Sequence, residues 1–134
     1  MNDCHCNTAD IYCIDSNAVD QFILKKIMNR YAPHVTIRFF NSPSKVIHPL
    51  LIEDIARPQL VLMELHYPNE PGWKLLDFLE KLPLLLPVVV LSSSILPHDQ
   101  TRALRYTMIH DYITKPFTSE NIESLRKYGL DLGE

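Results

Sequence analysis

Four short apolar segments of this chain each run directly into a polar or charged residue. The segments cover residues 11–14, 60–63, 88–91 and 112–114, and the residues that follow them are Asp15, Glu64, Ser92 and Lys115. If the segments are neighbouring parallel strands, their carboxyl ends lie along one edge of a sheet, which is where open parallel sheets bind ligands. The chemistry open to this chain is then that of one charged site with two carboxylates, a hydroxyl and an ammonium.

The stretches between these segments have the composition and spacing of helices and of one further strand. We expect strands at residues 11–14, 36–40, 60–63, 88–91 and 111–114, and helices at 19–30, 43 to about 55, 73–82, 98 to about 108 and 118 to about 128. Continuous apolar strands that alternate with helices indicate an α/β fold, with a parallel sheet covered by helices on both faces. The polar residues after the strands are therefore expected in loops at one edge of that sheet.

Apolar residues at helical spacing predict which side of each helix packs on the sheet. For the helix at 19–30, the predicted buried face consists of Phe22, Ile23, Ile27 and Tyr31. For the helix that begins near Pro43, it consists of Val46, Leu50, Leu51 and Ile55. The helix at 98–108 has few apolar positions, so we expect it to make little contact with the core.

The composition excludes several classes of function. The chain has 134 residues, a formal net charge of −3 and no block of basic residues, so we expect no binding to nucleic acid. The longest apolar stretch, residues 82–91, is interrupted by Pro83 and Pro87 and is too short to cross a bilayer. Because the N-terminus also lacks the pattern of a secretory signal, we expect a cytoplasmic protein without a membrane partner.

The length suits a single domain with a substantial core. We place that domain at residues 11–128, between a frayed segment at 1–10 and a C-terminal tail at 129–134. The chain leaves no room for an attached output domain, so we expect a stand-alone protein.

The three cysteines fit a reducing compartment. Cys4, His5 and Cys6 are adjacent, but a structural zinc site needs four ligands and no second pair of ligands is present. Free thiols in a frayed segment are therefore the favoured interpretation, and the role of Cys4 and Cys6 stays open.

Further landmarks occur in order along the chain with the four polar residues. In sequence order, the landmarks are Asp15, Glu64, Pro68, Gly72, Ser92 and Lys115-Pro116-Phe117. On this pattern, residues 11–128 resemble the receiver domain of bacterial two-component response regulators. The resemblance implies a flavodoxin-like (βα)5 three-layer fold, with a five-stranded parallel sheet in the order 2-1-3-4-5.

The resemblance also implies a role for each residue of the site. In that family, two acids after the first strand hold magnesium, and an aspartate after the third strand accepts a phosphoryl group from a histidine kinase. A serine or threonine and a lysine contact the phosphoryl oxygens, because phosphoryl transfer depends mostly on positioning and charge neutralisation. Glu64 thus stands at the phosphoacceptor position, Asp15 and Ser16 at the acidic pocket, and Ser92 and Lys115 at the phosphoryl contacts.

Two of these positions depart from the family pattern. Ser16 stands where the family usually carries its second acid, and Glu64 stands in place of aspartate. The additional methylene of Glu64 moves the carboxylate by about 1.5 Å, and a shift of about 1 Å can cost on the order of 100-fold in a reaction that depends on alignment. Asp15, Glu64 and Lys115 sum to a charge of −1 in place of the usual −2. We therefore expect no bound metal, although weak binding of magnesium through Asp15 and Glu64 stays open.

These departures favour a pseudo-receiver over an ordinary receiver domain. In this hypothesis Glu64 partly substitutes for the phosphorylated aspartate, and the protein acts through contacts with a histidine kinase or a downstream regulator and not as an enzyme. One alternative is a working phosphoacceptor receiver. Another is a small flavodoxin-like ligand-binding module, which is disfavoured because no Gly-rich phosphate loop follows the first strand.

The family resemblance implies that partners contact the fourth helix, the fifth strand and the fifth helix, and a homodimer through this face is one expected assembly. Tyr106, Arg102 and Arg105 are predicted there, and Arg and Tyr are common at interfaces. A plain solvated helix is the alternative. Tyr112 occupies the position of a family aromatic that changes orientation with signalling state, and it equally suits a core tyrosine. His66, near the predicted site, is expected to be a solvent-facing loop residue.

Overall fold

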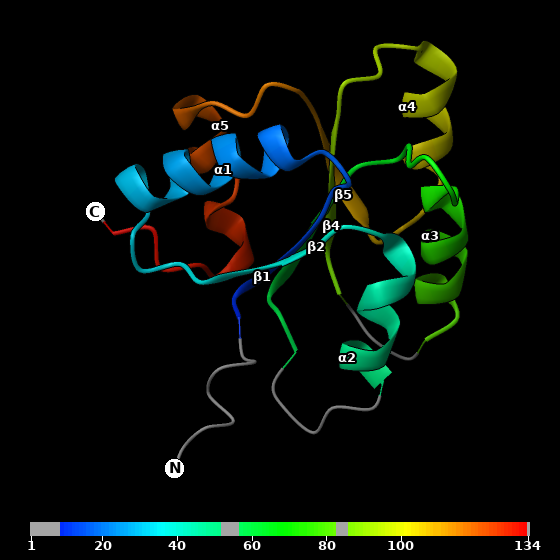
Figure 1. Ribbon diagram of the computed structural model, residues 1–134, viewed down its shortest axis with the longest axis horizontal. Helices are drawn as coiled ribbons and strands as arrows, with labels where there is room; N and C mark the ends of the chain where they lie inside the picture. Colours follow the sequence, from blue (N-terminus) through cyan, green and yellow to red (C-terminus); the bar gives the residue numbers. More distant parts are fainter. Residues whose placement is uncertain (1–8, 52–56, 83–85, 134) are drawn as a thin grey trace.

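Five parallel strands form one sheet in the order β2-β1-β3-β4-β5 (Figure 1). The strands are β1 (Ile11–Ile14), β2 (Ile37–Phe40), β3 (Leu60–Met63), β4 (Val88–Ser92) and β5 (Ile109–Thr114). This computed structural model describes residues 9–51, 57–82 and 86–133. The predicted α/β class and flavodoxin-like strand order are confirmed, and the strands begin and end within two residues of the predicted bounds.

Helices cover both faces of the sheet (Figure 1). One face carries α1 (Ala18–Tyr31), α5 (Ser119–Glu123) and the 3-10 turn η3 (Arg126–Tyr128). The other face carries α2 (Ile47–Leu51) with the preceding 3-10 turn η2 (Pro43–Val46), α3 (Gly72–Glu80) and α4 (Pro97–Ala103). The result is the predicted three-layer arrangement.

The side chains of the central strands alternate between two hydrophobic cores. In β1, Tyr12 and Ile14 pack in the core beneath α2 and α3, whereas Ile11 and Cys13 pack in the core beneath α1 and α5. Because both faces are covered, every residue of β1 is buried, which explains the unbroken apolar run.

The strand register determines which polar residues become neighbours. Ile14 of β1 pairs with Met63 of β3, so the next residues, Asp15 and Glu64, leave the sheet side by side. Ser92 is the last residue of β4 and pairs with Thr114, directly before Lys115. Register alone therefore brings residues from four distant parts of the sequence to one edge.

The predicted buried face of α1 is partly wrong. This helix buries Leu24 and Met28, whereas Phe22 and Tyr31 are 61% and 50% exposed. Apolar residues occur on more than one side of α1, so periodicity alone does not determine which side meets the sheet. That orientation follows from how the chain leaves β1 and enters the helix at its N-cap, Asn17.

Three other helices differ from their predicted extent or packing. The helix predicted from 118 to about 128 is shorter, because α5 ends at Glu123 and the separate 3-10 turn η3 covers residues 126–128. Val46 and Leu50 are buried as predicted, but Leu51 is exposed, and Ile55 lies outside the described residues. α4 ends at Ala103, well before the predicted end near residue 108, because residues 104–108 turn back toward β5.

The C-terminal residues pack against the domain. Residues 129–133, which we expected to be a tail, bury Leu130 and Leu132 in the core beneath α1 and α5. Cys4, His5 and Cys6 lie outside the described residues. Within the described ranges, no helix has the length and apolar character needed to cross a membrane.

Candidate functional site

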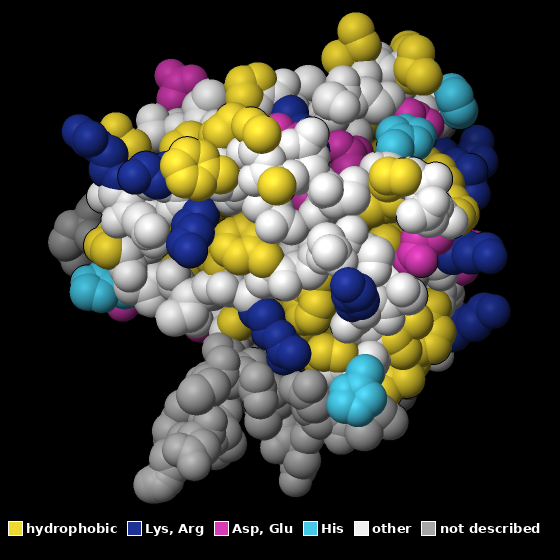
Figure 2. Space-filling model, in the orientation of Figure 1, with side chains coloured by type: hydrophobic (Ala, Val, Ile, Leu, Met, Phe, Trp, Pro, Cys, Tyr) yellow, Lys and Arg dark blue, Asp and Glu magenta, His cyan; other side chains and the backbone are white. Residues whose placement is uncertain are grey.

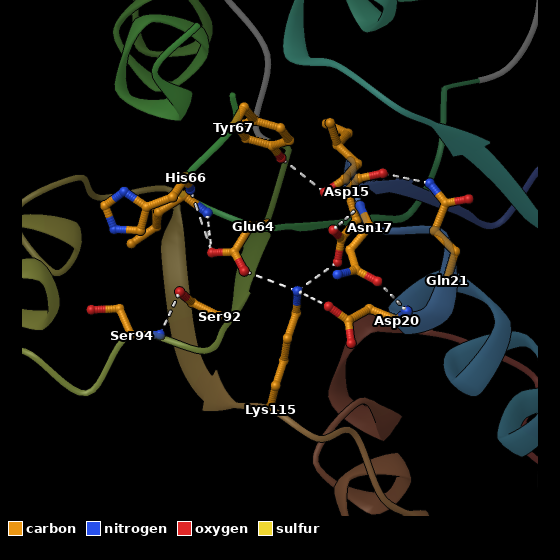
Figure 3. A network of polar contacts seen from close by, with 12 residues as sticks. Asp15, Asn17, Asp20, Gln21, Glu64, His66, Tyr67, Ser92, Ser94 and Lys115 are labelled. Atoms are coloured by element: carbon orange, nitrogen blue, oxygen red, sulfur yellow. Dashed lines mark hydrogen bonds and ion pairs between the residues drawn. The ribbon is translucent and has the colours of Figure 1, made fainter. Parts of the chain in front are cut away.

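The charged residues that follow the strands meet at the carboxyl edge of the sheet. The Lys115 Nζ atom lies 2.7 Å from Asp15 Oδ2, 2.7 Å from Asp20 Oδ2 and 2.9 Å from Glu64 Oε1 (Figure 3). The side chains of Lys115, Asp15 and Glu64 are 9%, 5% and 7% exposed. The two acids and the lysine predicted from the sequence therefore form one buried cluster, which Asp20 joins.

Asp15 is anchored by its backbone and by its side chain. Its N–H donates to the carbonyl of Phe40 at the end of β2, and its own carbonyl accepts a hydrogen bond of 2.6 Å from Gln21 Nε2. The carboxylate oxygen Oδ1 accepts from the backbone N–H of Asn17 at 2.9 Å, which leaves Oδ2 directed at Lys115. The loop between β1 and α1 thus holds this carboxylate in one orientation.

Glu64 is anchored in a similar way at the end of β3. Its Oε2 atom accepts a 2.7 Å hydrogen bond from the backbone N–H of Leu65, while Oε1 contacts Lys115. Burial by itself would raise the pKa of Glu64. Hydrogen bonds from Ser92, Lys115 and the Leu65 N–H outweigh burial and lower the pKa below its ordinary value, so the carboxylate is charged at neutral pH.

The loop after Glu64 is held close to α3 by a glycine. The N–H of Gly72 donates to the carbonyl of Leu65 at 3.0 Å. A Cβ atom at position 72 would lie 2.7 Å from that carbonyl oxygen, which is too close, and 3.2 Å from the carbonyl oxygen of Glu64, which is a tight contact. Only glycine therefore lets α3 begin beside the residues that orient Glu64.

The pKa values of Asp15 and Lys115 are both raised, but for different reasons. Burial raises the pKa of Asp15, and the Lys115 and Asn17 hydrogen bonds only partly oppose it. For Lys115, burial would lower the pKa, but the contacts with Asp15, Asp20 and Glu64 outweigh that effect and raise it. The ammonium therefore stays protonated at neutral pH.

Asp20 is the site residue that sequence reasoning missed. It lies in the first turn of α1 and is not one of the residues that follow a strand, so the strand-end pattern does not include it. The expected charge of −1 at the site is consequently wrong. Asp15, Asp20, Glu64 and Lys115 together sum to −2, the value expected for an ordinary family site. The N-cap residue Asn17, three positions earlier, is the signal that could have placed Asp20 at this edge.

The residues on the α4 side form a second polar network. Ser92 is fully buried, and its Oγ atom accepts a 3.1 Å hydrogen bond from the N–H of Ser94. The Ser94 hydroxyl donates to Asp99 Oδ2 at 2.6 Å, and His66 Nε2 lies 2.9 Å from the same oxygen. Hydrogen bonding from Ser94 is the main reason that the pKa of Asp99 is lowered. His66 is exposed as expected, but its ring also contacts this buried carboxylate, which sequence reasoning did not foresee.

Two residues of the predicted signalling face also contact α3. Tyr106 stacks on Trp73, with 6.2 Å between ring centroids, and its hydroxyl donates to Asp77 Oδ1 at 2.6 Å. The guanidinium of Arg102 lies 4.1 Å from the centre of the Trp73 ring. Tyr106 is therefore half-buried against α3, whereas Arg102 contacts the Trp73 ring and, like Arg105, is exposed.

Tyr112 and Ser16 occupy contrasting positions. Tyr112 is half-buried, packs against the core beneath α2 and α3, and donates its hydroxyl proton to the carbonyl of Ser94 at 3.1 Å. Ser16 is exposed in the loop between β1 and α1 and does not belong to the contacts around Lys115. The structure thus connects Tyr112 to the α4 side, whereas Ser16 lies beside the charged cluster without joining it.

The arrangement of the acids does not fit a magnesium ion. Magnesium prefers oxygen ligands in octahedral geometry, but the point at which the three carboxylates converge is taken by Lys115 Nζ. In residues 9–51, 57–82 and 86–133, no three His, Cys, Asp or Glu side chains are grouped so that they could hold a metal ion. A divalent cation would have to displace the ammonium to reach these oxygens.

Comparison with a protein-family model identifies the same span of residues. A model of the response regulator receiver domain matches residues 11–126, which is most of the chain. No curated protein matches the sequence.

The fold is also similar to solved structures. One is a two-component response regulator from Cytophaga hutchinsonii, with a TM-score of 0.78 and 24% sequence identity over 87% of this chain and 92% of that chain. A second, from Legionella pneumophila, has a TM-score of 0.79 and 19% identity over 90% and 96%. A third is the Mn2+-bound form of response regulator Rcp1, with a TM-score of 0.77 and 17% identity over 95% and 98%. At these identities the likeness establishes the fold.

Proposed function

The chain belongs to the response regulator receiver domain family, and on that premise we propose that it is a pseudo-receiver. It is a receiver domain of two-component response regulators in which a glutamate occupies the phosphoacceptor position. In this proposal Glu64 does not take part in ordinary phosphotransfer, and the domain signals through contacts with other proteins rather than as an enzyme.

The observation that carries the proposal is the contact between Glu64 and Lys115. The carboxylate lies 2.9 Å from the ammonium, is 7% exposed, and has a lowered pKa. A buried acid in this state is charged without any modification. It supplies a permanent negative charge beside Ser92 and Lys115, the two residues whose family counterparts contact the phosphoryl group.

The mimicry is expected to be partial. A phosphoryl group carries about −1.5 to −2 charges and three oxygens, whereas a carboxylate carries one charge and two oxygens. One Glu64 oxygen is directed at Lys115 and the other at the N–H of Leu65. A partner would therefore meet a site that is held in one state, with no phosphoryl group to gain or lose.

Glu64 also makes a poor acceptor for geometric and chemical reasons. Both of its oxygens already accept strong hydrogen bonds, and the carboxylate is displaced by about one C–C bond from the position that an aspartate would give it. An attack on phosphorus requires one oxygen to leave its partner and align with the donor. A working phosphoacceptor receiver remains the competing function because the three acids restore the usual charge of −2.

We propose that partners approach from the side of the site. Exposed apolar residues lie on or next to the two helices beside the site: Phe22 on α1, Ile95 and Leu96 before α4, and Leu104 after α4. Figure 2 shows hydrophobic side chains on the surface over α1 and around α4. These residues suit contact with a histidine kinase or a downstream regulator in the cytoplasm. A homodimer through α4, β5 and α5 would use the exposed Arg102, Leu104 and Arg105, since Tyr106 is half-buried against α3.

The test is phosphorylation with a small-molecule phosphodonor and magnesium, followed by intact mass spectrometry. The wild-type chain should show no stable phosphoryl adduct. A double variant, Ser16→Asp with Glu64→Asp, restores both family acids and should gain one. An ordinary receiver domain treated alongside shows that donor and magnesium are competent. A stable adduct mapped to Glu64 of the wild-type chain would overturn the proposal.

A further inference from the structure

The ammonium of Lys115 has no donor left for another ligand. A lysine side chain offers three N–H donors, and Asp15, Asp20 and Glu64 lie 2.7, 2.7 and 2.9 Å from Nζ. One carboxylate oxygen thus accounts for each donor. A phosphoryl oxygen could bind this ammonium only after one of the three acids had been released.

Local geometry directs Asp20 toward this lysine. Asn17 caps α1 by accepting a 3.0 Å hydrogen bond from the N–H of Asp20. An acid at this third helical position often reaches back to the N–H of the cap residue. Here Asp15 Oδ1 already accepts that N–H at 2.9 Å, so the Asp20 carboxylate extends to Lys115 instead.

We propose that Asp20 is the third acid of the site and that the Lys115 ammonium is the built-in counter-ion of all three carboxylates. Because the ammonium is attached to the chain, its presence between the carboxylates does not depend on its concentration in solution. A metal ion must displace it, and the displaced charge would then lose all three partners. Asp20, at 30% exposed the most accessible of the acids, is the partner that the lysine would release first.

This inference concerns the same site as the proposed function and rests on it only in that Glu64 stays unmodified. It is tested without a phosphodonor, by measuring the melting temperature in metal-free buffer and with MgCl2 or MnCl2. The wild-type chain should show no cation-dependent shift. In Lys115→Met the carboxylates lose their counter-ion, and the melting temperature should rise by about 3–6 °C when the cation is at tenfold excess over its dissociation constant.

The role of Asp20 is isolated by two further variants. Adding Asp20→Asn to Lys115→Met should weaken cation binding about tenfold or more, because one charged ligand is lost. Adding Asp111→Asn is the matched control: Asp111 pairs with Lys127 at 3.0 Å and its side chain is 36% exposed, comparable to that of Asp20. The control should keep the full shift. A wild-type shift as large as that of Lys115→Met, or a full shift without Asp20, would overturn the proposal.

A second measurement decides the question if Lys115→Met does not fold. The exchange of lysine ammonium protons with water can be followed by NMR in the wild-type chain, in Asp20→Asn and in Asp111→Asn. Exchange at Lys115 should become about tenfold faster in Asp20→Asn and should stay unchanged in Asp111→Asn. Equal exchange at Lys115 in all three proteins would contradict the role of Asp20. A phosphoryl adduct on Glu64 would contradict the proposed function. The cation-dependent melting shifts and the ammonium exchange rates would still test the role of Asp20, because both are measured without a phosphodonor.

Discussion

The two helices that flank the site, α1 and α4, are held to the sheet in different ways. α1 has 14 residues, a side-chain cap at Asn17, and buries Leu24 and Met28. α4 has seven residues, has no side-chain cap, and buries Ala103 and Asp99. Much of the attachment of α4 is therefore polar, whereas α1 combines an apolar contact with the ion pair of Asp20.

The difference indicates which side of the site is easier to move. On the α1 side, Lys115 links α1, β1 and Glu64 through ion pairs with the buried Asp15 and Glu64 and with the partly exposed Asp20. On the α4 side, Ser92, Ser94 and Asp99 form a chain of hydrogen bonds that reaches an exposed histidine. Elements with few buried apolar contacts unfold locally at a lower free energy than well-packed elements. We infer that α1 is the fixed side of the site and α4 the adjustable side.

The largest effect is expected from Lys115→Met. This substitution leaves three carboxylates without their counter-charge, and removing one partner of a buried ion pair costs about 3 kcal/mol or more. The free energy of unfolding from chemical denaturation at pH 7, in metal-free buffer, measures it. Asp111→Asn, which breaks the exposed pair with Lys127, serves as the control and should change stability by less than about 1 kcal/mol. Equal losses in the two variants would contradict the fixed α1 side.

A smaller effect is expected on the α4 side from Asp99→Asn. The substitution removes the charge that accepts from Ser94 and contacts His66, and it should cost about 1.5 kcal/mol. Hydrogen exchange should show the change mainly in α4 and in the loop before it. Faster exchange throughout α1 would show that the two sides are not separate.

A third prediction concerns Asn17, the residue that caps α1. Asn17→Ala removes the side chain that accepts the Asp20 N–H, and the loss of such a cap typically costs about 1 kcal/mol. Because the cap also positions Asp20, the substitution should make the Lys115 ammonium protons exchange faster with water, as measured by NMR. Asn41→Ala, at an exposed loop position, is the control and should leave both stability and ammonium exchange nearly unchanged.

The smallest effect is expected in the pH dependence of stability. The pKa of Glu64 is lowered from 4.5, so its contribution is present above pH 4.5 and is lost as the pH falls through the folded value. The pKa of Asp15 is raised from 3.8, so its contribution is present below pH 3.8 and is lost as the pH rises through the folded value. Glu64→Gln should therefore flatten the loss of stability below pH 4.5. If the free energy of unfolding falls equally steeply below pH 4.5 in Glu64→Gln and in the wild-type chain, the lowered pKa of Glu64 is contradicted.

Much of the fold and part of the site could be predicted from the sequence. Buried strands read as unbroken apolar runs, and their ends bring Asp15, Glu64, Ser92 and Lys115 to one edge whatever the details of the loops. These predictions depend only on strand register, which parallel pairing transmits directly from one strand to the next.

What could not be predicted depends on orientation rather than pattern. Asp20 joins the site only because of the direction in which Asn17 starts α1, and the same direction determines that Leu24, and not Phe22, faces the sheet. The contact between His66 and Asp99 joins two loops that are 33 residues apart. Such contacts follow from the placement of whole elements, which periodicity does not specify.

The most direct test of the central claim is a titration of the side-chain carboxyl carbons of Glu64 and Asp15, followed by NMR. A fixed negative charge at the phosphoacceptor position requires Glu64 to be ionised and paired with Lys115. The account predicts a pKa below 4.5 for Glu64 and above 3.8 for Asp15, so the two acids depart from their ordinary values in opposite directions. A pKa above 4.5 for Glu64, which would indicate a carboxyl without its ammonium partner, would contradict it.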